Sequence, residues 1–372
     1  MFIWILMLCV IFAICAGAAL YLMTRVRRLS CLKNKKKTWA RLISAAVVLL
    51  PAVALSFLWS PLNMVVCVLH LALFLLAADG ISALVRRLRR RDFRRDWAGL
   101  AALLLCAAWL TSGWVNANHV WRTHYAIETD KPVGSLRVAL LSDSHMGTTF
   151  HADGFAGRLA DVQAQEPDVA VFVGDFTDES TTREDMAAAA KALGALKTPC
   201  GVYFVFGNHD KNNYEGEGRA YTGEELAAEL TKNGVVVLED EIVPIRGGFC
   251  LIGRQDASEE TENRGGRASM AELTRNLDES RFSIVLDHQP RDYVNQAASG
   301  VDLVLSGHTH GGQMIPLVQL IRWFHLGDDN VYGLQRRGNT DFIVSSGISD
   351  WELLFKTGCR SEYVIIDIQG KN

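Results

Sequence analysis

The sequence lacks the closely spaced cysteines of a disulfide framework or a structural zinc site. It has eight cysteines and no CxxC pair. Five fall in apolar stretches or in a basic segment between them, which leaves Cys200, Cys250 and Cys359 for the rest of the chain. Three widely spaced cysteines exclude a small domain held together by several disulfides. One disulfide among the three stays open if they face an oxidising compartment.

Acidic residues are scarce in the first third of the chain. Residues 1–122 contain 16 Lys and Arg but 3 Asp and Glu, whereas residues 123–372 contain 22 and 38. A basic N-terminal region is therefore followed by an acidic C-terminal one. We expect two domains with these boundaries.

Four long apolar stretches occupy the basic region, at residues 2–23, 42–59, 62–85 and 97–115. Each is close to the roughly 20 residues with which a helix crosses a bilayer. A cleaved signal peptide is the alternative for the first stretch, but no positive charge precedes it and three more stretches follow. The sequence predicts about four transmembrane helices.

The basic residues gather in two loops between these stretches: Arg25, Arg27, Arg28, Lys33, Lys35, Lys36 and Lys37, and then Arg86, Arg87, Arg89, Arg90, Arg91, Arg94 and Arg95. Positive loops stay on the cytoplasmic side. With four crossings, the C-terminal domain then lies on the extracytoplasmic side. Basic runs also bind nucleic acid, but here apolar helices flank both runs and the remaining domain is acidic. We therefore expect membrane lipids, and no nucleic acid, as neighbours of the loops.

The acidic region alternates continuous apolar runs with helical stretches. Strands buried on both faces carry consecutive apolar residues, as found at 136–142, 168–174, 201–207, 282–288 and 301–307. Helices are expected at 152–165 and 184–196, with further short strands near residues 238, 251, 343 and 365. This predicts a layered α/β domain with mixed or paired sheets. The polar residues 254–270 are predicted to be a solvated loop, with a lid over the site as the alternative.

Residues of metal-binding type follow each of the five buried runs. They are Asp143 and His145, Asp175, Asn208 and His209, His288, and finally His308 and His310 in GHTHGGQ. A lone Asp after a strand is more often a cap or turn former, and a lone His is more often an ordinary core or surface residue. Structural needs alone would not place such residues after five successive strands. Because the carboxyl ends of strands share a sheet edge, the pattern predicts one common site.

The residue types at this site indicate two metal ions. Carboxylate, amide and imidazole ligands without thiolate favour Mn, Fe or Zn and disfavour a closed structural zinc site. Seven candidate ligands exceed the needs of one ion, whereas two ions about 3.5 to 4 Å apart would use them. Glycines in GHTHGGQ let the backbone turn sharply, so that both imidazoles face one cavity.

The ordered motifs DxH, GDxxD, GNHD, an isolated histidine and GHxH resemble the calcineurin-like metallophosphoesterases over about residues 135–370. GHTHGGQ and the preceding membrane region are similar to the bacterial membrane-associated branch with its YkuE-like and YaeI-like proteins. The resemblance implies a layered α/β sandwich of mixed β-sheets flanked by helices. It also implies hydrolysis of phosphoric esters by two divalent ions.

Carried over by position, the resemblance implies a role for each motif residue. One ion would be held by Asp143, His145, Asp175 and His310, and the other by Asp175, Asn208, His288 and His308. His209 would stabilise or protonate the leaving oxygen, with Asp210 orienting it, while a hydroxide activated by both ions attacks phosphorus in line. Ser346 and Ser361 stand where the family often has an arginine and a proline; both lie outside the metal set.

These observations predict a membrane-anchored two-metal phosphoesterase acting on a phosphomonoester or phosphodiester. A lipid-linked or envelope substrate is expected because the helices hold the site near a bilayer. One alternative is a UDP-sugar-lipid pyrophosphate hydrolase, which would need a cytoplasmic site. Another is an inactive receptor or scaffold, which would be expected to lack a ligand or His209. A transporter would carry more polar groups in its membrane helices than His70 and Asp79.

Overall fold

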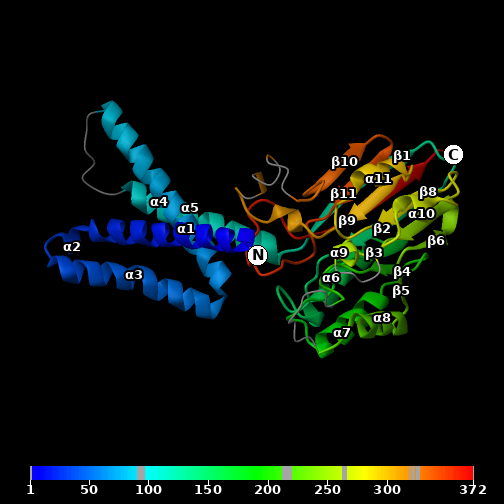
Figure 1. Cartoon of the computed structure of the whole chain (residues 1–372), viewed down its shortest axis with the longest axis horizontal. Coiled ribbons are helices and arrows are strands. Elements are labelled where there is room, and N and C mark those ends of the chain that lie inside the picture. Colours follow the sequence, from blue (N-terminus) through cyan, green and yellow to red (C-terminus); the bar gives the residue numbers. More distant parts are fainter. Residues whose placement is uncertain are drawn as a thin grey trace. The chain divides into compact units, whose positions relative to one another are not determined.

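The computed structural model describes residues 2–89, 97–211, 220–261, 266–316, 318–319, 323 and 327–371 (Figure 1). The chain divides into two compact units, Met1–Ser112 and Gly113–Asn372. The basic residues Arg90, Arg91, Arg94 and Arg95 and the central part of the expected loop, 262–265, lie outside the described residues.

The first unit consists of helices. They are α1 (Phe2–Arg27), the short α2 (Ser30–Lys33), α3 (Lys37–Leu58), α4 (Pro61–Arg89) and α5 (Trp97–Asn118), whose last six residues belong to the second unit. Four of these helices are long and apolar enough to cross a membrane, as the sequence predicts. Small residues such as Ala18 and Ala72 pack between them, as is usual where membrane helices approach closely. Asp79 pairs with Arg25 and accepts a hydrogen bond from the Tyr21 hydroxyl, so its charge is satisfied within the bundle.

The second unit contains two six-stranded mixed sheets. The first has the order β1-β12-β2-β3-β4-β5 and the second β10-β11-β9-β8-β7-β6. The strands are β1 (Trp121–Thr129), β2 (Ser135–Leu141), β3 (Val169–Val173), β4 (Val202–Val205), β5 (Val235–Val237), β6 (Glu241–Ile245), β7 (Phe249–Gly253), β8 (Phe282–Leu286), β9 (Leu303–Ser306), β10 (Gly333–Arg337), β11 (Thr340–Val344) and β12 (Glu362–Gly370).

Three hydrophobic clusters hold the layers together. Side chains from both sheets, including Leu140 and Leu305, form the cluster between them. The outer face of the first sheet is covered by α6 (Ala152–Gln163), α7 (Arg183–Gly194) and α8 (Gly223–Lys232), and that of the second by α10 (Met270–Thr274) and α11 (Tyr293–Ala298). The expected sandwich of mixed sheets flanked by helices is therefore confirmed.

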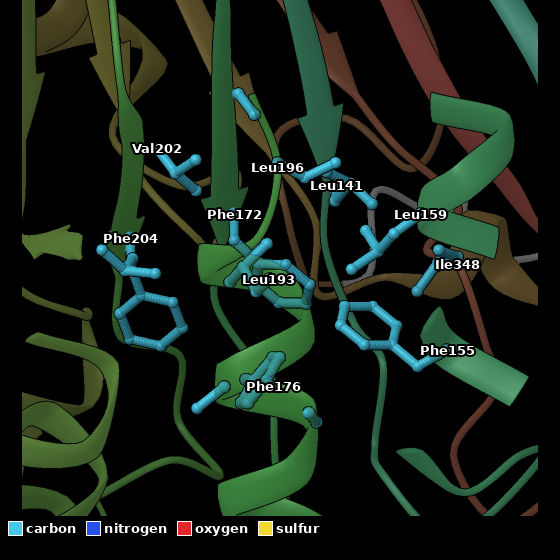
Figure 2. Packing of buried hydrophobic residues seen from close by; sticks show 14 of the residues in the cluster. Leu141, Phe155, Leu159, Phe172, Phe176, Leu193, Leu196, Val202, Phe204 and Ile348 are labelled. Atoms are coloured by element: carbon cyan, nitrogen blue, oxygen red, sulfur yellow. The ribbon is translucent and has the colours of Figure 1, made fainter. Parts of the chain in front are cut away.

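An aromatic cluster fixes the segment that carries Asp175 (Figure 2). Phe176, directly after Asp175, is fully buried, and its ring centroid lies 5.0 Å from that of Phe172 and 5.7 Å from that of Phe155. Both contacts are edge-to-face, the arrangement that aromatic pairs favour. The core thus holds the backbone beside Asp175 in place.

The structure differs from the sequence-based expectations in three edge strands and in one loop. Strands β1, β6 and β10 were not expected, and β1, for example, is mostly polar and exposed. The expected solvated loop is wrong at its N-terminal end, where Arg254 and Asp256 are buried and α9 (Ser258–Thr261) forms. All eight cysteines are described, and all are free.

Candidate metal centre

Six of the seven expected ligands form two groups at the carboxyl ends of the strands. The first group is Asp143, His145 and His310, and the second is Asp175, His288 and His308. Within each group the candidate ligand atoms all lie within 4.8 Å of one another. All are buried except His308, which is half-buried.

Asn208, the seventh expected ligand, lies on the loop after β4 next to Asp175. The preceding Gly207 approaches so closely that a Cβ atom there would lie 2.3 Å from Asp175 Oδ1. The backbone N–H of His209, which follows, donates to the same Asp175 oxygen at 2.9 Å. Asn208 is itself buried, and both of its chain neighbours lie against Asp175 of the second group.

Five of the six grouped residues have a left-handed backbone conformation. The φ angles are 55° for Asp143, 36° for His145, 53° for Asp175, 71° for His308 and 48° for His310. Few residues other than glycine adopt this region, and such strain gathers at functional sites. Backbone hydrogen bonds between the loops stabilise this left-handed conformation. Examples run from Asp143 N to Gly174 O at 3.0 Å and from His145 N to Asp175 O at 3.2 Å.

Close approach explains why glycine precedes His308. A Cβ atom at Gly307 would lie 2.3 Å from Asp143 Oδ2, so no larger residue fits beside that carboxylate. Gly311 instead follows the sequence-based expectation, because its φ of 63° belongs to a sharp turn. The glycines therefore serve two purposes, space for a ligand and freedom for a turn.

The histidine rings are oriented as metal ligands require. His288 Nδ1 lies 2.8 Å from Val173 O, to which it donates, and this turns Nε2 toward Asp175 Oδ2 at 3.0 Å. His145 Nδ1 lies 3.4 Å from Asp178 Oδ2, and His310 Nδ1 lies 3.4 Å from Ser349 O. Such partners on the far ring nitrogen are typical of metal-bound histidines.

The facing atoms of the first group also fit a bound cation. The Nε2 atoms of His145 and His310 are 3.1 Å apart, a distance at which two lone pairs repel unless a proton or a cation lies between them. Asp143 Oδ2 is buried and accepts no hydrogen bond from the described residues. A divalent ion would satisfy all three atoms at once.

Charge around the centre favours the metal-binding form of Asp175, His308 and His310, whereas burial of His288 is outweighed by the charge of Asp175, which raises the pKa of His288 well above its ordinary value. Burial alone would raise the pKa of Asp175, but His288, His209 and His145 outweigh it and hold that pKa well below its usual range. Burial, together with neighbouring cations, lowers the pKa of His310 well below its ordinary value and also that of His308. Asp175 is thus a carboxylate, and these two imidazoles are neutral.

His209 lies beside the two groups and has a carboxylate partner that sequence reasoning missed. Its Nδ1 is 3.5 Å from Glu179 Oε2, and its ring contacts those of His145 and Trp351 at centroid distances of 5.1 and 5.3 Å. Burial lowers the pKa of His209, but the charges of Asp175 and Glu179 outweigh this and raise it to about 9.

Asp210, expected to orient His209, accepts hydrogen bonds from the loop after β3 and from its own loop after β4. Its Oδ1 accepts from Thr177 N at 2.9 Å and its Oδ2 from Gly207 N at 2.9 Å. These bonds tie the loop after β3 to the loop after β4. The structure therefore places Asp210 as a brace between loops and Glu179 as the carboxylate that faces His209 Nδ1.

Other supporting residues also escaped sequence reasoning. Asp178, the last residue of GDFTD, could have been noticed from its motif, and the hydrogen bond from His145 overcomes the effect of burial to lower its pKa to about 2. Asp350 and Lys356 are fully buried behind His310, with the Lys356 Nζ atom 3.4 Å from Asp350 Oδ1. No motif marks these two residues.

Residues 136–312 match the sequence profile of the calcineurin-like phosphoesterases. An uncharacterised metallophosphoesterase of Campylobacter jejuni is 32% identical over 241 residues, which cover 63% of this chain and 60% of that protein. A transmembrane protein with a metallophosphoesterase domain from Danio rerio is 30% identical over 273 residues, 70% of this chain and 60% of that protein.

The uncharacterised metallophosphoesterase YkuE of Bacillus subtilis is 25% identical over 305 residues, covering 77% of this chain and 100% of that protein. This chain matches about three fifths of the length of the Campylobacter and Danio relatives. Together with the four apolar helices, these likenesses indicate a membrane protein with candidate metal ligands.

Proposed function

We propose, on the premise that this chain belongs to the calcineurin-like phosphoesterase family, that it is a membrane-anchored, two-metal hydrolase of phosphomonoesters or phosphodiesters. The observation that carries the proposal is the pair of adjoining ligand groups, Asp143, His145 and His310 beside Asp175, His288 and His308. When bound, two divalent ions would activate a water and neutralise charge on the phosphoryl oxygens.

Asp175 is the residue that would join the two ions. Its Oδ2 atom is 3.0 Å from His288 Nε2 in the second group and 3.7 Å from His145 Nε2 in the first. The low pKa keeps it charged. One carboxylate thus reaches both groups, which supports the bridging role, while Asn208 would complete the second group.

His209 would give a proton to the leaving oxygen. Without bound ions, burial of the ring is outweighed by the charges of Asp175 and Glu179, which raise the pKa of His209 to about 9. With ions on Asp175, Glu179 would be the remaining carboxylate that favours the protonated ring, the form that a general acid needs. Glu179 near Nδ1 would hold the ring in place, which leaves Nε2 as the donating atom. Asp210 would act indirectly, by bracing the loops that carry Asp175 and His209.

We infer that the catalytic unit lies on the extracytoplasmic side of the cytoplasmic membrane. We also infer that its substrate is lipid-linked or part of the cell envelope. Basic loops adjoin the apolar helices, and positive loops favour the cytoplasm. A reporter enzyme active only outside the cytoplasm, fused after the last residue, should be active. An inactive reporter, with an active cytoplasmic one, would support the UDP-sugar-lipid pyrophosphate hydrolase instead.

The function is tested by hydrolysis of bis-p-nitrophenyl phosphate and p-nitrophenyl phosphate. The purified chain is stripped of metal and refilled with Mn, Zn or Mg, with Asp175→Asn as the control. Metal-dependent release that the control lacks would establish the two-ion chemistry, and the ratio of the two rates would identify the ester class. No release from these esters or from membrane lipid extracts, with any metal, would contradict the proposal and favour an inactive scaffold.

A further inference from the structure

The last turn of α5, which belongs to the second unit, is hydrogen-bonded to a later segment of the same unit. The last four carbonyls of a helix normally lack partners within it. Here Ser361 provides hydrogen-bond donors for two of these carbonyls. Its N–H donates to Asn116 O at 2.8 Å, and its hydroxyl donates to Ala117 O at 2.9 Å. These carbonyls lie at the end of a predicted membrane-spanning helix, yet their partners come from residues more than 240 positions later.

A second connection joins this turn to Lys356. The backbone N–H of Lys356 donates to Gly113 O at 2.9 Å, and Asn116 Nδ2 donates to Lys356 O at 3.2 Å. A Cβ atom at Gly113 would lie 2.8 Å from Thr357 Cγ2, so glycine permits the close approach. The backbone of Lys356 is therefore held on both sides by the helix end.

The side chain of Lys356 points into the protein and is fully buried. Its Nζ atom donates to Ser346 O at 2.7 Å and to Ser349 O at 3.0 Å, and it lies 3.4 Å from Asp350 Oδ1. A buried ammonium is costly unless it is paired and hydrogen-bonded. All three partners come from residues 346–350, so the lysine closes that segment into a defined loop.

This loop contacts two members of the first ligand group. Ser349 N donates to Asp143 O at 3.2 Å, while Ser349 O lies 3.4 Å from His310 Nδ1. Gly347 packs so tightly that a Cβ atom there would be 2.7 Å from Asp143 Cβ. One carbonyl, Ser349 O, thus contacts both Lys356 and a ligand histidine.

We propose that Lys356, held by the last turn of α5, is a positioning residue for the metal held by Asp143, His145 and His310. The helix end is then part of the metal centre's support, not only an anchor. This inference rests on the proposed two-metal function. It predicts that binding at the first position depends on Lys356, while binding at the second group does not.

The test is a metal titration of the full-length chain in detergent, comparing Lys356→Met with wild type. Loss of a supporting contact typically weakens metal binding about tenfold to hundredfold, and we expect that loss for one ion only. Lys356→Arg, which keeps the charge and the donors, should recover most of the affinity. Lys232→Met is the matched control, because this exposed lysine on α8 pairs only with Glu229 among the described residues.

Two further variants keep the inference testable if Lys356→Met does not fold. The double variant Lys356→Met, Asp350→Asn removes both buried charges, and Ser361→Ala removes only the hydroxyl that reaches α5. The double variant should show the loss at one ion, and Ser361→Ala a smaller loss at the same ion. Wild type with two ions and variants with unchanged affinities would overturn the inference alone, whereas a wild type that binds no divalent ion would overturn the proposed function as well.

Discussion

The two ligand groups of the metal centre are supported by different neighbours. In the first group, Asp178 Oδ2 is 3.4 Å from His145 Nδ1, while the partner of His310 Nδ1 is a neutral carbonyl, Ser349 O, at 3.4 Å. In the second group, His288 Nδ1 donates to a neutral carbonyl, Val173 O, at 2.8 Å. A carboxylate behind an imidazole makes it a more basic ligand, so His145 is the ring whose basicity a neighbouring carboxylate should raise.

The second group depends instead on a buried ionic cluster next to His288. Asp287 accepts from Arg254 at 2.8 Å, from Arg267 at 3.0 Å and from Gln296 at 2.7 Å. None of these residues is among the candidate ligands. A carboxylate thus lies beside one ring of the first group, whereas buried arginines hold the residue before His288 in the second, and each group can be perturbed separately.

Replacing Asp175, which reaches both ligand groups, should weaken metal binding at both of them. Asp175→Asn is expected to lose both ions and to lower hydrolysis by at least about a thousandfold, because two-metal catalysis needs the bridging charge. Metal content by mass spectrometry and the rate with p-nitrophenyl esters would measure this. Retention of one tightly held ion would show that Asp175 does not bridge.

His209→Ala should leave both ligand groups loaded and still abolish most turnover. General acid catalysis contributes about a hundredfold to ten-thousandfold, so kcat should fall by that order while metal content stays near that of wild type. A substrate with an activated leaving group should be affected least. An empty site in this variant would mean that His209 is a ligand.

Asp287→Asn tests the support of the second ligand group. The change leaves Arg254 and Arg267 buried without their full countercharge, and breaking a buried pair typically costs about 3 to 5 kcal/mol. We expect a lower midpoint of chemical unfolding in the second unit, followed by the tryptophan fluorescence. Unchanged unfolding with weakened metal binding would show that Asp287 acts electrostatically instead.

Asp178→Asn tests the support of the first ligand group and should have the smallest effect. We expect about tenfold to hundredfold weaker binding of the first ion, with the second nearly unchanged. Two-site titration calorimetry with Mn would separate the two steps. Equal weakening of both ions would mean that the two ligand groups are coupled more closely than their contacts indicate.

Much of this organisation could be predicted from local sequence. Apolar runs marked the membrane helices and the buried strands, and the residues directly after those strands include six that the structure brings into two groups. The prediction succeeded because the parallel strands β2, β3 and β4 of the first sheet and β8 and β9 of the second carry the candidate ligands at their carboxyl ends, and these ends meet in the folded domain. Their roles as metal ligands stay predictions.

The supporting residues could not be found this way. Glu179, Asp350, Lys356 and Asp287 carry no motif, and β1 reads as a polar exposed segment. Several acquire their roles from partners distant in sequence, as Glu179 does from His209 and Lys356 from Gly113.

Local sequence was enough to predict two regions, the layered α/β class and the candidate ligands, because hydrophobic periodicity and residue type act locally. Which candidate ligands lie together, which carboxylate faces His209 and which lysine lies behind His310 could be read only from the folded chain. Those outcomes depend on distances of about 3 Å between separate loops, over which hydrogen bonds and charges act.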